Sequence, residues 1–399
     1  MSAVTQLFES PSRTDHIAGA ISCELLEVLT NSPMLEHKTK YMIPVLEELF
    51  KHVDWAKSFD IPLVIIYEEV ITTEILIGIH SWLRTKCADI ENITLIISHH
   101  CGVQRWWRQW CDVHQQRSFS IAEVSFGYSF HMVKRASLDN LTSFPLPEMP
   151  QPEFPLPEIP DLSTISDKKD ILYHFNVYGG TYPTLDRLYI ILRLLELRDH
   201  GVIEYIGTVP DKQTILNYVE DITYFKNQLE VDAISDMYER YIVNNQLIEQ
   251  NLRFEVNNNA AKNDPFFSGH QYEVDNRCFA SIVRETINFQ PYAFVTEKTL
   301  KALLHHLAVI PISYRAVDDL EAQGFWFPHD VIDYSYQWQS DQSRRMTMLI
   351  DAVKQMIKKF STDDLNHYYR ENLKHFHHNT KLVYDIVQDP LITYRKLNP

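Results

Sequence analysis

The feature that most constrains this chain is a proline-rich stretch near its middle. Residues 144–160 read FPLPEMPQPEFPLPEIP, with seven prolines in seventeen positions. Proline has no backbone N–H to donate, so this stretch can form neither a helix nor a central strand. We expect an extended, semi-rigid connector over residues 144–167 that separates two domains. The alternative is a long proline-rich surface loop within one domain.

The sequence before the connector alternates short apolar runs with segments of helical spacing. Residues 61–67 (IPLVIIY) and 93–98 (ITLIIS) are continuous apolar runs, which is typical of buried parallel strands. A further strand is predicted within residues 121–130. This rhythm favours a Rossmann-like open sheet over residues 1–143. Helices are predicted over residues 21–28, 41–52 and 72–83.

The same rhythm returns after the connector, which predicts a second α/β domain over residues 168–360 and a helical segment over 361–399. Strands are predicted at residues 170–177, 203–209 and 309–313, and a short helix or turn at 277–284. The predicted helices span residues 185–197, much of 212–250, 299–307, 344–360 and 362–387. Two α/β domains commonly bind ligands in a crevice, but the architecture alone does not define a function.

Charge and cysteine usage narrow the classes of protein. The formal net charge of −16 argues against broad binding to nucleic acid, although a local basic groove stays possible. Five cysteines without a CxxC pair favour a reduced, cytoplasmic protein. Charges interrupt every long apolar run, and residues 1–14 lack the apolar core of a signal peptide, so we expect no membrane span.

The most informative chemistry surrounds residues 294–299 (FVTEKT). Thr296 is a suitable N-cap for the helix that follows, and free backbone amides at a helix start attract anions. Lys298 and Lys301 add positive charge, while Glu297 can accept hydrogen bonds from ribose hydroxyls. The alternative is an ordinary capped helix whose charges are solvated.

This segment carries a resemblance. Residues 292–311 (YAFVTEKTLKALLHHLAVIP) resemble the donor-binding motif of fucosyltransferase-like GT-B glycosyltransferases, and resemble even more a family of nucleotide-sugar glycosyltransferases from large phages and other viruses. Residues 281–286 (SIVRET), 320–336 (LEAQGFWFPHDVIDYSY) and 175–188 (FNVYGGTYPTLDRL) are similar to the same family. The resemblance covers much of residues 170–340, and no phrase of the first half matches. It implies an α/β GT-B fold, with two Rossmann-like domains facing a central cleft.

The resemblance also implies roles for single residues. Glu297 and Lys298 would bind the ribose and phosphates of the donor, and Arg187 would supply a second cation. Asn176 would line the donor cleft at the end of its strand, and Glu285 would lie near the sugar or help orient the loop.

In the loop after that strand, this sequence departs from the family, which has more arginines there. Here the loop carries Gly179 and Gly180, whose backbone amides can replace some of the missing charge.

A general base is needed to take the proton of the acceptor hydroxyl, and it should come from the first domain. Two pairs follow predicted strands, Glu68 with Glu69 and His99 with His100, at the edge where parallel sheets present ligands. Either pair is otherwise a solvated loop, and Asp112 is a weaker third candidate.

No metal is expected. GT-B enzymes of this type generally need none, and no DxD motif follows a strand. Asp318, Asp319, Asp363 and Asp364 read as helix-start or solvated acids. The spacing of His375, His377 and His378 suits no closed metal site and predicts a solvated helix.

The run RWWRQW is the most unusual of the first half, and it lies in a locally basic stretch. Arg105, Trp106, Trp107, Arg108 and Trp110 are suited to contact sugars, bases or phosphates as an acceptor surface. The alternative is an amphipathic helix that buries its tryptophans.

Together these features predict a metal-independent, inverting glycosyltransferase that uses a nucleotide sugar, with UDP or GDP as the nucleotide and no other cofactor. Its acceptor would be hydroxymethylated cytosine in phage DNA, which places it in the host cytoplasm, or a glycan, as in the fucosyltransferase-like enzymes. A different class remains open, a non-catalytic module that binds sugar nucleotides.

Overall fold

The computed structural model describes residues 17–21, 63–67, 71, 73–87, 90–98, 100–124, 169–178, 185–204, 211–221, 232, 235–236, 238–240, 275–285 and 291–388. The chain divides into two compact units. Unit 1 comprises Met1–Glu153, Gln290–Thr296 and Asp385–Pro399, and unit 2 comprises Phe154–Phe289 and Glu297–Tyr384. The proline-rich residues 144–160 lie outside the described part.

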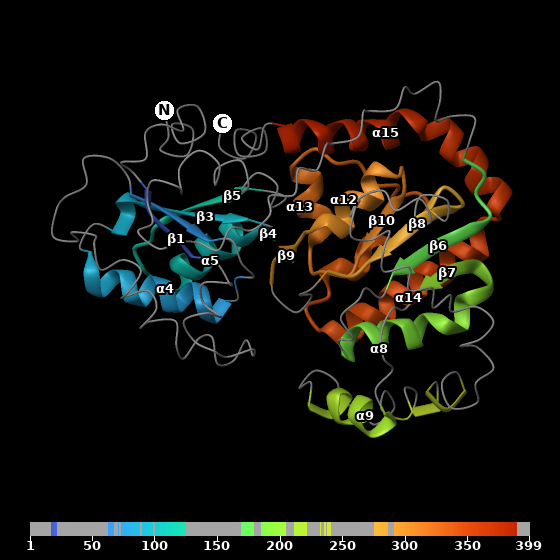
Figure 1. The fold of residues 1–399 in the computed structure, drawn as a ribbon, viewed down its shortest axis with the longest axis horizontal. Coiled ribbons are helices and arrows are strands. Elements are labelled where there is room, and N and C mark those ends of the chain that lie inside the picture. The colour runs from blue at the N-terminus through green and yellow to red at the C-terminus, as the bar shows by residue number, and fades with distance from the viewer. Residues whose placement is uncertain are drawn as a thin grey trace, which may run out of the picture. The chain divides into compact units, whose positions relative to one another are not determined.

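Unit 1 contains a four-stranded sheet in which all neighbouring strands are parallel (Figure 1). Its order is β1 (Ile17–Ile21), β2 (Leu63–Tyr67), β3 (Ile93–Ser98) and β5 (Ser120–Val124). The strands predicted at residues 61–67, 93–98 and 121–130 are confirmed in kind and approximate position. Strand β1 was not predicted. The helix predicted from residue 21 onward lies mostly outside the described residues, as does the one at 41–52.

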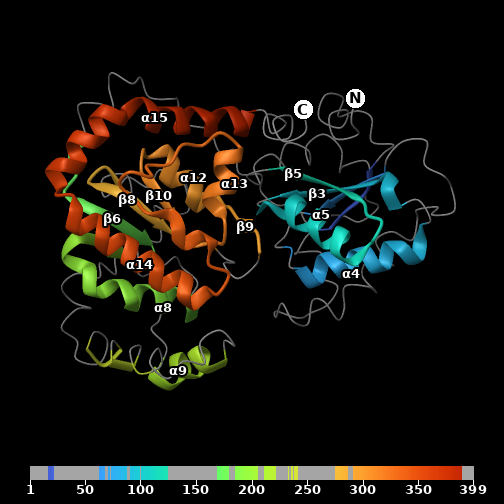
Figure 2. The same ribbon diagram turned by 180° about the vertical axis from the view of Figure 1, so that it is seen from behind.

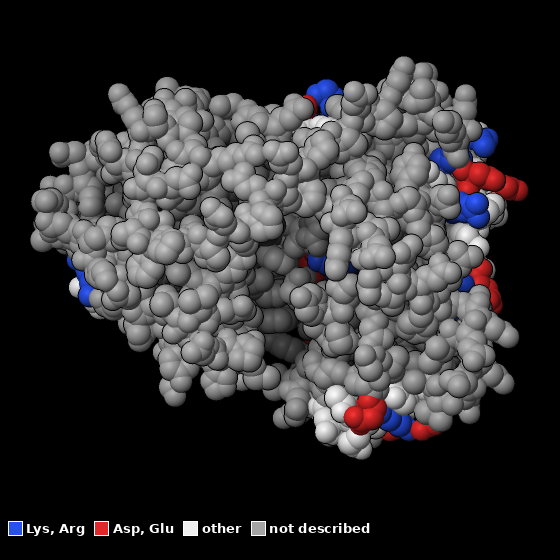
Figure 3. Space-filling view, in the orientation of Figure 1, with Lys and Arg blue, Asp and Glu red and all other residues white. Residues whose placement is uncertain are grey.

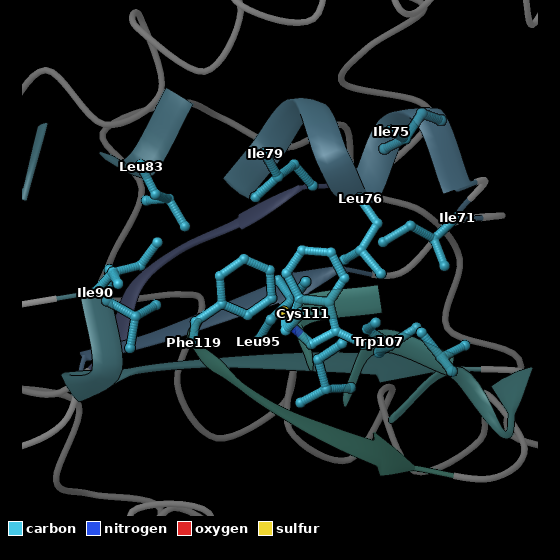
Figure 4. Packing of buried hydrophobic residues seen from close by; sticks show 14 of the residues in the cluster. Ile71, Ile75, Leu76, Ile79, Leu83, Ile90, Leu95, Trp107, Cys111 and Phe119 are labelled. Atoms are coloured by element: carbon cyan, nitrogen blue, oxygen red, sulfur yellow. The ribbon is translucent and has the colours of Figure 1, made fainter. Parts of the chain in front are cut away.

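Two helices, α4 (Thr73–Lys86) and α5 (Val103–His114), bury their apolar faces in one cluster with β3 and β5. Trp107 lies at its centre, stacked between Trp110 at 4.9 Å and Phe119 at 5.0 Å between ring centroids. Figure 4 shows Trp107 and Phe119 side by side, with the isoleucines and leucines of α4 above them. The helix predicted at residues 72–83 is therefore confirmed.

A short segment from late in the chain completes unit 1. Strand β9 (Ala293–Phe294) pairs antiparallel with β4 (His100–Cys101). Tyr292 donates a hydrogen bond of 2.9 Å from its hydroxyl to the carbonyl of Ile71 and is buried. The motif at residues 294–299 therefore begins in unit 1 and continues into unit 2.

Unit 2 contains a second parallel sheet, ordered β10 (Ala308–Pro311), β8 (Cys278–Val283), β6 (Tyr173–Tyr178) and β7 (Gly201–Glu204). The strands predicted at residues 170–177 and 309–313 are confirmed as β6 and β10. Strand β7 overlaps only the start of the strand predicted at 203–209, and residues 205–209 lie outside the described part. The helix or turn predicted at residues 277–284 is wrong, because these residues form the internal strand β8. All six residues of β8 are buried, so they show no polar alternation, and so short an apolar run does not distinguish strand from helix.

Helices cover both faces of the unit 2 sheet. Helices α12 (Glu297–Leu304) and α15 (Thr362–Gln388) lie on one side, and α8 (Leu185–Leu194) and α14 (Gln342–Lys359) on the other, as Figures 1 and 2 show. These helices confirm the predictions at residues 185–197, 299–307, 344–360 and 362–387, whereas most of the helical region predicted within 212–250 lies outside the described residues. The remaining described elements are η3 (Leu195–His200), α9 (Lys212–Asp221), α13 (Ala316–Ala322) and η5 (Tyr334–Trp338).

The charges on the described surface are mixed. In the region of α9, acidic and basic side chains lie next to one another (Figure 3), as in the ion pair of 2.6 Å between Lys212 and Glu239. No helix among the described residues combines the length and apolar character needed to cross a bilayer.

Candidate functional site

The candidate site lies at the carboxyl end of β8, where the chain places two charged residues directly after a buried strand. Arg284 and Glu285 follow Val283 and are 5% and 2% exposed. The backbone N–H of Ile312, just after β10, donates to the carbonyl of Val283 at 3.1 Å. The loops after β8 and β10 are therefore neighbours at the edge where parallel sheets bind ligands.

Glu285 connects this edge to the start of α12. One carboxylate oxygen accepts a hydrogen bond of 2.7 Å from the hydroxyl of Thr299. The other lies 3.7 Å from the ammonium nitrogen of Lys298, whose side chain is 30% exposed. A buried carboxylate needs such partners because its desolvation is costly. Glu285 thus positions Lys298, while part of the lysine still faces solvent.

Arg284, the residue before Glu285, adds a second, buried cation whose charge interacts with that of Glu285. Burial lowers the pKa of Arg284 to about 9, and the charge of Glu285 acts in the opposite direction. The guanidinium therefore remains protonated at neutral pH. Two cations and one carboxylate give Arg284, Lys298 and Glu285 a combined charge of +1. Together with Thr299 we call these residues the β8-edge cluster.

The start of α12 agrees with the position expected for a capped helix. Helix α12 begins at Glu297, so the buried Thr296 directly precedes it, where an N-cap residue stands. The side chain of Glu297 lies outside the described part. Lys301 is in the last turn of α12 and is half-buried, so it lies one turn away from the backbone amides at the helix start. Its part in phosphate binding stays a prediction.

Other donor residues suggested by the resemblance are tested less directly. Arg187 is the third residue of α8, but its side chain is not among those described, and Gly179 and Gly180 lie outside the described residues. Arg284 is instead the cation that the structure places in the cluster. Arg284 lies in the SIVRET segment, but the resemblance implies no role for it. The available signal was a pair of opposite charges directly after an apolar run.

Asn176 lies within β6 rather than at its end, so the position expected for it is wrong. The strand continues to Tyr178, and Asn176 is completely buried. Its side-chain nitrogen donates to a carboxylate oxygen of Asp275 at 2.7 Å, and the other oxygen of Asp275 is hydrogen-bonded to Nδ1 of His305. Asp275 and His305 lie in the segments that lead into β8 and β10. The role of Asn176 in donor binding stays a prediction.

A buried lysine lies close to this network. The ammonium of Lys169 donates to the carbonyl of His306 at 2.7 Å and lies 4.9 Å from the ring centre of Tyr369. Burial lowers the pKa of Lys169 to about 7, against the smaller opposing effects of Cys278 and Asp275. Perturbed groups of this kind often mark functional sites, but this one is covered by protein and takes part in packing.

The structure does not show whether the candidate bases lie near one another, because most of their side chains are outside the described part. Glu68, Glu69 and His99 lie outside them, and of His100 only the backbone is described, in β4. Asp112 is exposed on α5. The identity of the base therefore stays a prediction.

The RWWRQW run forms part of α5, and its alternative interpretation as an amphipathic helix is confirmed. Trp107 is 2% exposed in the core, and Trp106 and Trp110 are half-buried against it. Arg108 is exposed and Arg105 is half-buried. The three indoles therefore do not all present an exposed face on which an acceptor could stack. The role of this helix as an acceptor surface stays a prediction, and it depends on the two arginines.

The start of α5 is already occupied by a carboxylate. The buried Glu123 of β5 accepts hydrogen bonds from the backbone amides of Gly102, at 3.0 Å, and Gln104. Gly102 has a φ of 82°, a left-handed conformation that glycine adopts without strain. This helix start therefore binds the protein's own carboxylate, which sequence reasoning missed.

The acids and histidines set aside in the sequence mostly lie as expected. Asp318 with Asp319, and Asp363 with Asp364, stand in the first turns of α13 and α15, although Asp319 is buried. The histidines of α15 are less solvated than predicted, because that helix lies against the loop around Trp326. His375 stacks on Trp326 at 4.9 Å, and His378 is hydrogen-bonded to the carbonyl of Gly324.

No protein-family model and no curated protein matches the chain, so these comparisons assign it to no family. The chemistry of the site therefore rests on its own residues.

Proposed function

We propose that this protein is a nucleotide-sugar-dependent glycosyltransferase of the GT-B kind, with its donor bound at the β8-edge cluster. The observation that supports this most is the arrangement of Arg284, Glu285 and Lys298. Lys298 lies 3.7 Å from the buried carboxylate of Glu285, and the buried Arg284 directly precedes Glu285, at the carboxyl edge of a parallel sheet and beside the start of a helix. Such an edge suits the diphosphate of a nucleotide sugar.

The proposed chemistry follows from these charges. An acceptor hydroxyl attacks the anomeric carbon, so a new C–O bond forms while the bond between that carbon and the diphosphate oxygen breaks. Arg284, Lys298 and the amides of α12 stabilise the negative charge on the departing nucleoside diphosphate. A general base takes the hydroxyl proton. Attack opposite the leaving group inverts the anomeric configuration, as the resemblance to fucosyltransferases implies.

The acceptor is proposed as hydroxymethylated cytosine in DNA, with a glycan as the alternative. A DNA acceptor would need local positive charge in a chain of net charge −16, and exposed Arg108 and half-buried Arg105 offer some. A glycan acceptor would make no such demand. UDP and GDP sugars are the donors to test first.

The test begins with thermal unfolding in the presence of UDP, GDP, CMP and their sugars. One of them should raise the melting temperature, because a ligand that binds only the folded state stabilises it. The Lys298→Ala variant should lose this rise and lose sugar transfer. Lys358→Ala, at an exposed position of α14, serves as the matched control and should keep both.

Transfer is then measured by mass spectrometry on hydroxymethylated and unmodified duplex DNA and on glycans. If Lys298→Ala keeps full activity, the assignment of the donor site is wrong. Nucleotide binding without transfer or donor hydrolysis would instead indicate a non-catalytic binding module.

A further inference from the structure

An exposed tryptophan lies beyond the end of β10, next to the loop that adjoins the β8-edge cluster. Trp338 is the last residue of η5 and is 53% exposed. Two buried tyrosines place it: the hydroxyl of Tyr334 donates to the carbonyl of Val309 at 3.0 Å, and that of Tyr336 to Pro311 at 2.9 Å. η5 therefore runs in the direction of β10 and ends beyond its carboxyl end.

Arg315 covers part of this indole. Its guanidinium carbon lies 4.5 Å from the centre of the Trp338 ring, and its backbone N–H donates to the carbonyl of Gln337 at 3.0 Å. Asp318 holds the guanidinium through an ion pair of 3.2 Å, and the Arg315 side chain is 25% exposed. Arg315 has a φ of 55°, a conformation that costs a residue other than glycine some free energy and that occurs preferentially at functional sites.

The surrounding residues fix this pair rigidly. The buried side chain of Gln337 accepts hydrogen bonds from the backbone amides of Val317 and Asp318 and donates to the carboxylate of Asp318 at 2.9 Å. The buried Arg345 donates to the carbonyl of Ile312 at 2.9 Å and to that of Gln339 at 2.6 Å. These bonds tie the segment that follows Trp338 to the residue that follows β10.

We propose that Arg315 and Trp338 form the subsite that binds the base of the nucleotide, which rests on the proposed function. An indole with an exposed face stacks planar bases, and a guanidinium can both stack and donate to carbonyl oxygens of guanine or uracil. Ile312 links the two parts of the site, because its N–H bonds to Val283 and the chain reaches Arg315 three residues later. The β8-edge cluster binds the diphosphate, and this pair binds the base.

The experiment compares two probes by isothermal titration calorimetry of the full chain. GDP and UDP carry a base, whereas inorganic pyrophosphate carries only the diphosphate. Trp338→Ala should weaken binding of the preferred nucleotide about tenfold and leave pyrophosphate binding unchanged. Trp338→Phe keeps an aromatic face and should retain most of the nucleotide affinity. Lys298→Ala should weaken both probes.

The outcomes separate the two proposals. If Trp338→Ala binds nucleotide as tightly as the unchanged protein, or loses pyrophosphate binding equally, the base subsite is refuted while the donor site stands on the Lys298→Ala result. If neither nucleotide binds the unchanged protein, both proposals are wrong. Melting temperatures of the Trp338 variants confirm that they are folded, which is expected for an exposed position.

Discussion

The buried Lys169 makes a distinct prediction about how stability depends on pH. Its pKa is lowered by burial from 10.5 to about 7 in the folded protein. The unfolded chain therefore binds more protons than the folded one between pH 7 and 10.5, so this group makes the free energy of unfolding rise with pH. A lysine that pairs with a carboxylate has a raised pKa and behaves in the opposite way. The perturbation that isolates the effect is Lys169→Met, which keeps the length of the side chain and removes the charge.

The magnitude follows from the size of the shift. At about 1.4 kcal/mol for each pKa unit, the group costs the folded state about 5 kcal/mol well below pH 7, and roughly 2 kcal/mol of this is relieved between pH 7 and 9. The hydrogen bond to the carbonyl of His306 survives deprotonation, because a neutral amine still donates. Lys169→Met also loses this bond, so the stability of the variant at a single pH does not isolate the effect of the charge. The change of the unfolding free energy with pH does isolate it.

The assay is urea unfolding of both proteins at pH 7, 8 and 9, followed by circular dichroism. The difference in unfolding free energy between the unchanged protein and Lys169→Met should move by roughly 2 kcal/mol in favour of the unchanged protein over this range. Parallel pH profiles would show that Lys169 has an ordinary pKa, and a difference that moves the other way would show that it is stabilised as a cation.

Three further changes test the packing around the two sheets. Gly201→Ala places a methyl group 2.4 Å from the ring of Phe175 and should lower the unfolding free energy by about 1–3 kcal/mol, partly restored by Phe175→Leu; a neutral effect would contradict the close approach. Glu285→Ala removes a buried carboxylate and should cost about 3 kcal/mol, against under about 1 kcal/mol for Lys298→Ala, and equal melting temperatures would refute this ranking. Glu123→Ala leaves the start of α5 without its acceptor and should cost about 1–2 kcal/mol in urea unfolding, whereas no loss would show that the carboxylate does not cap that helix.

The strands that could be predicted from the sequence are those with a long apolar run and clear polar flanks. Strand β3 has both, and its predicted and observed bounds agree. All six residues of strand β8 are buried, so they carry no periodicity, and only the neighbouring strands β6 and β10 settle its type. Strand β1 contains small residues and depends on its pairing with β2. Tertiary pairing, which is not visible in a local pattern, decided these two.

The candidate site shows a similar division. The helix start at residues 296–298 was predictable, because N-capping is a local signal. The joining of Lys298 to Glu285 depends on the loop after β8 meeting α12 in space. Trp338 was overlooked for the same reason. Its exposure and its contact with Arg315 arise from tyrosines that bond to a strand more than twenty residues away.

The most direct test of the central claim is hydrogen–deuterium exchange with and without the nucleotide that raises the melting temperature. If the donor binds at the β8-edge cluster, exchange should slow in peptides that cover residues 278–285 and 297–304, which hold the cluster, and should not change in peptides of α14 away from it. Protection that appears only in other parts of the chain, or no protection at saturating nucleotide, would contradict the placement of the donor at this edge.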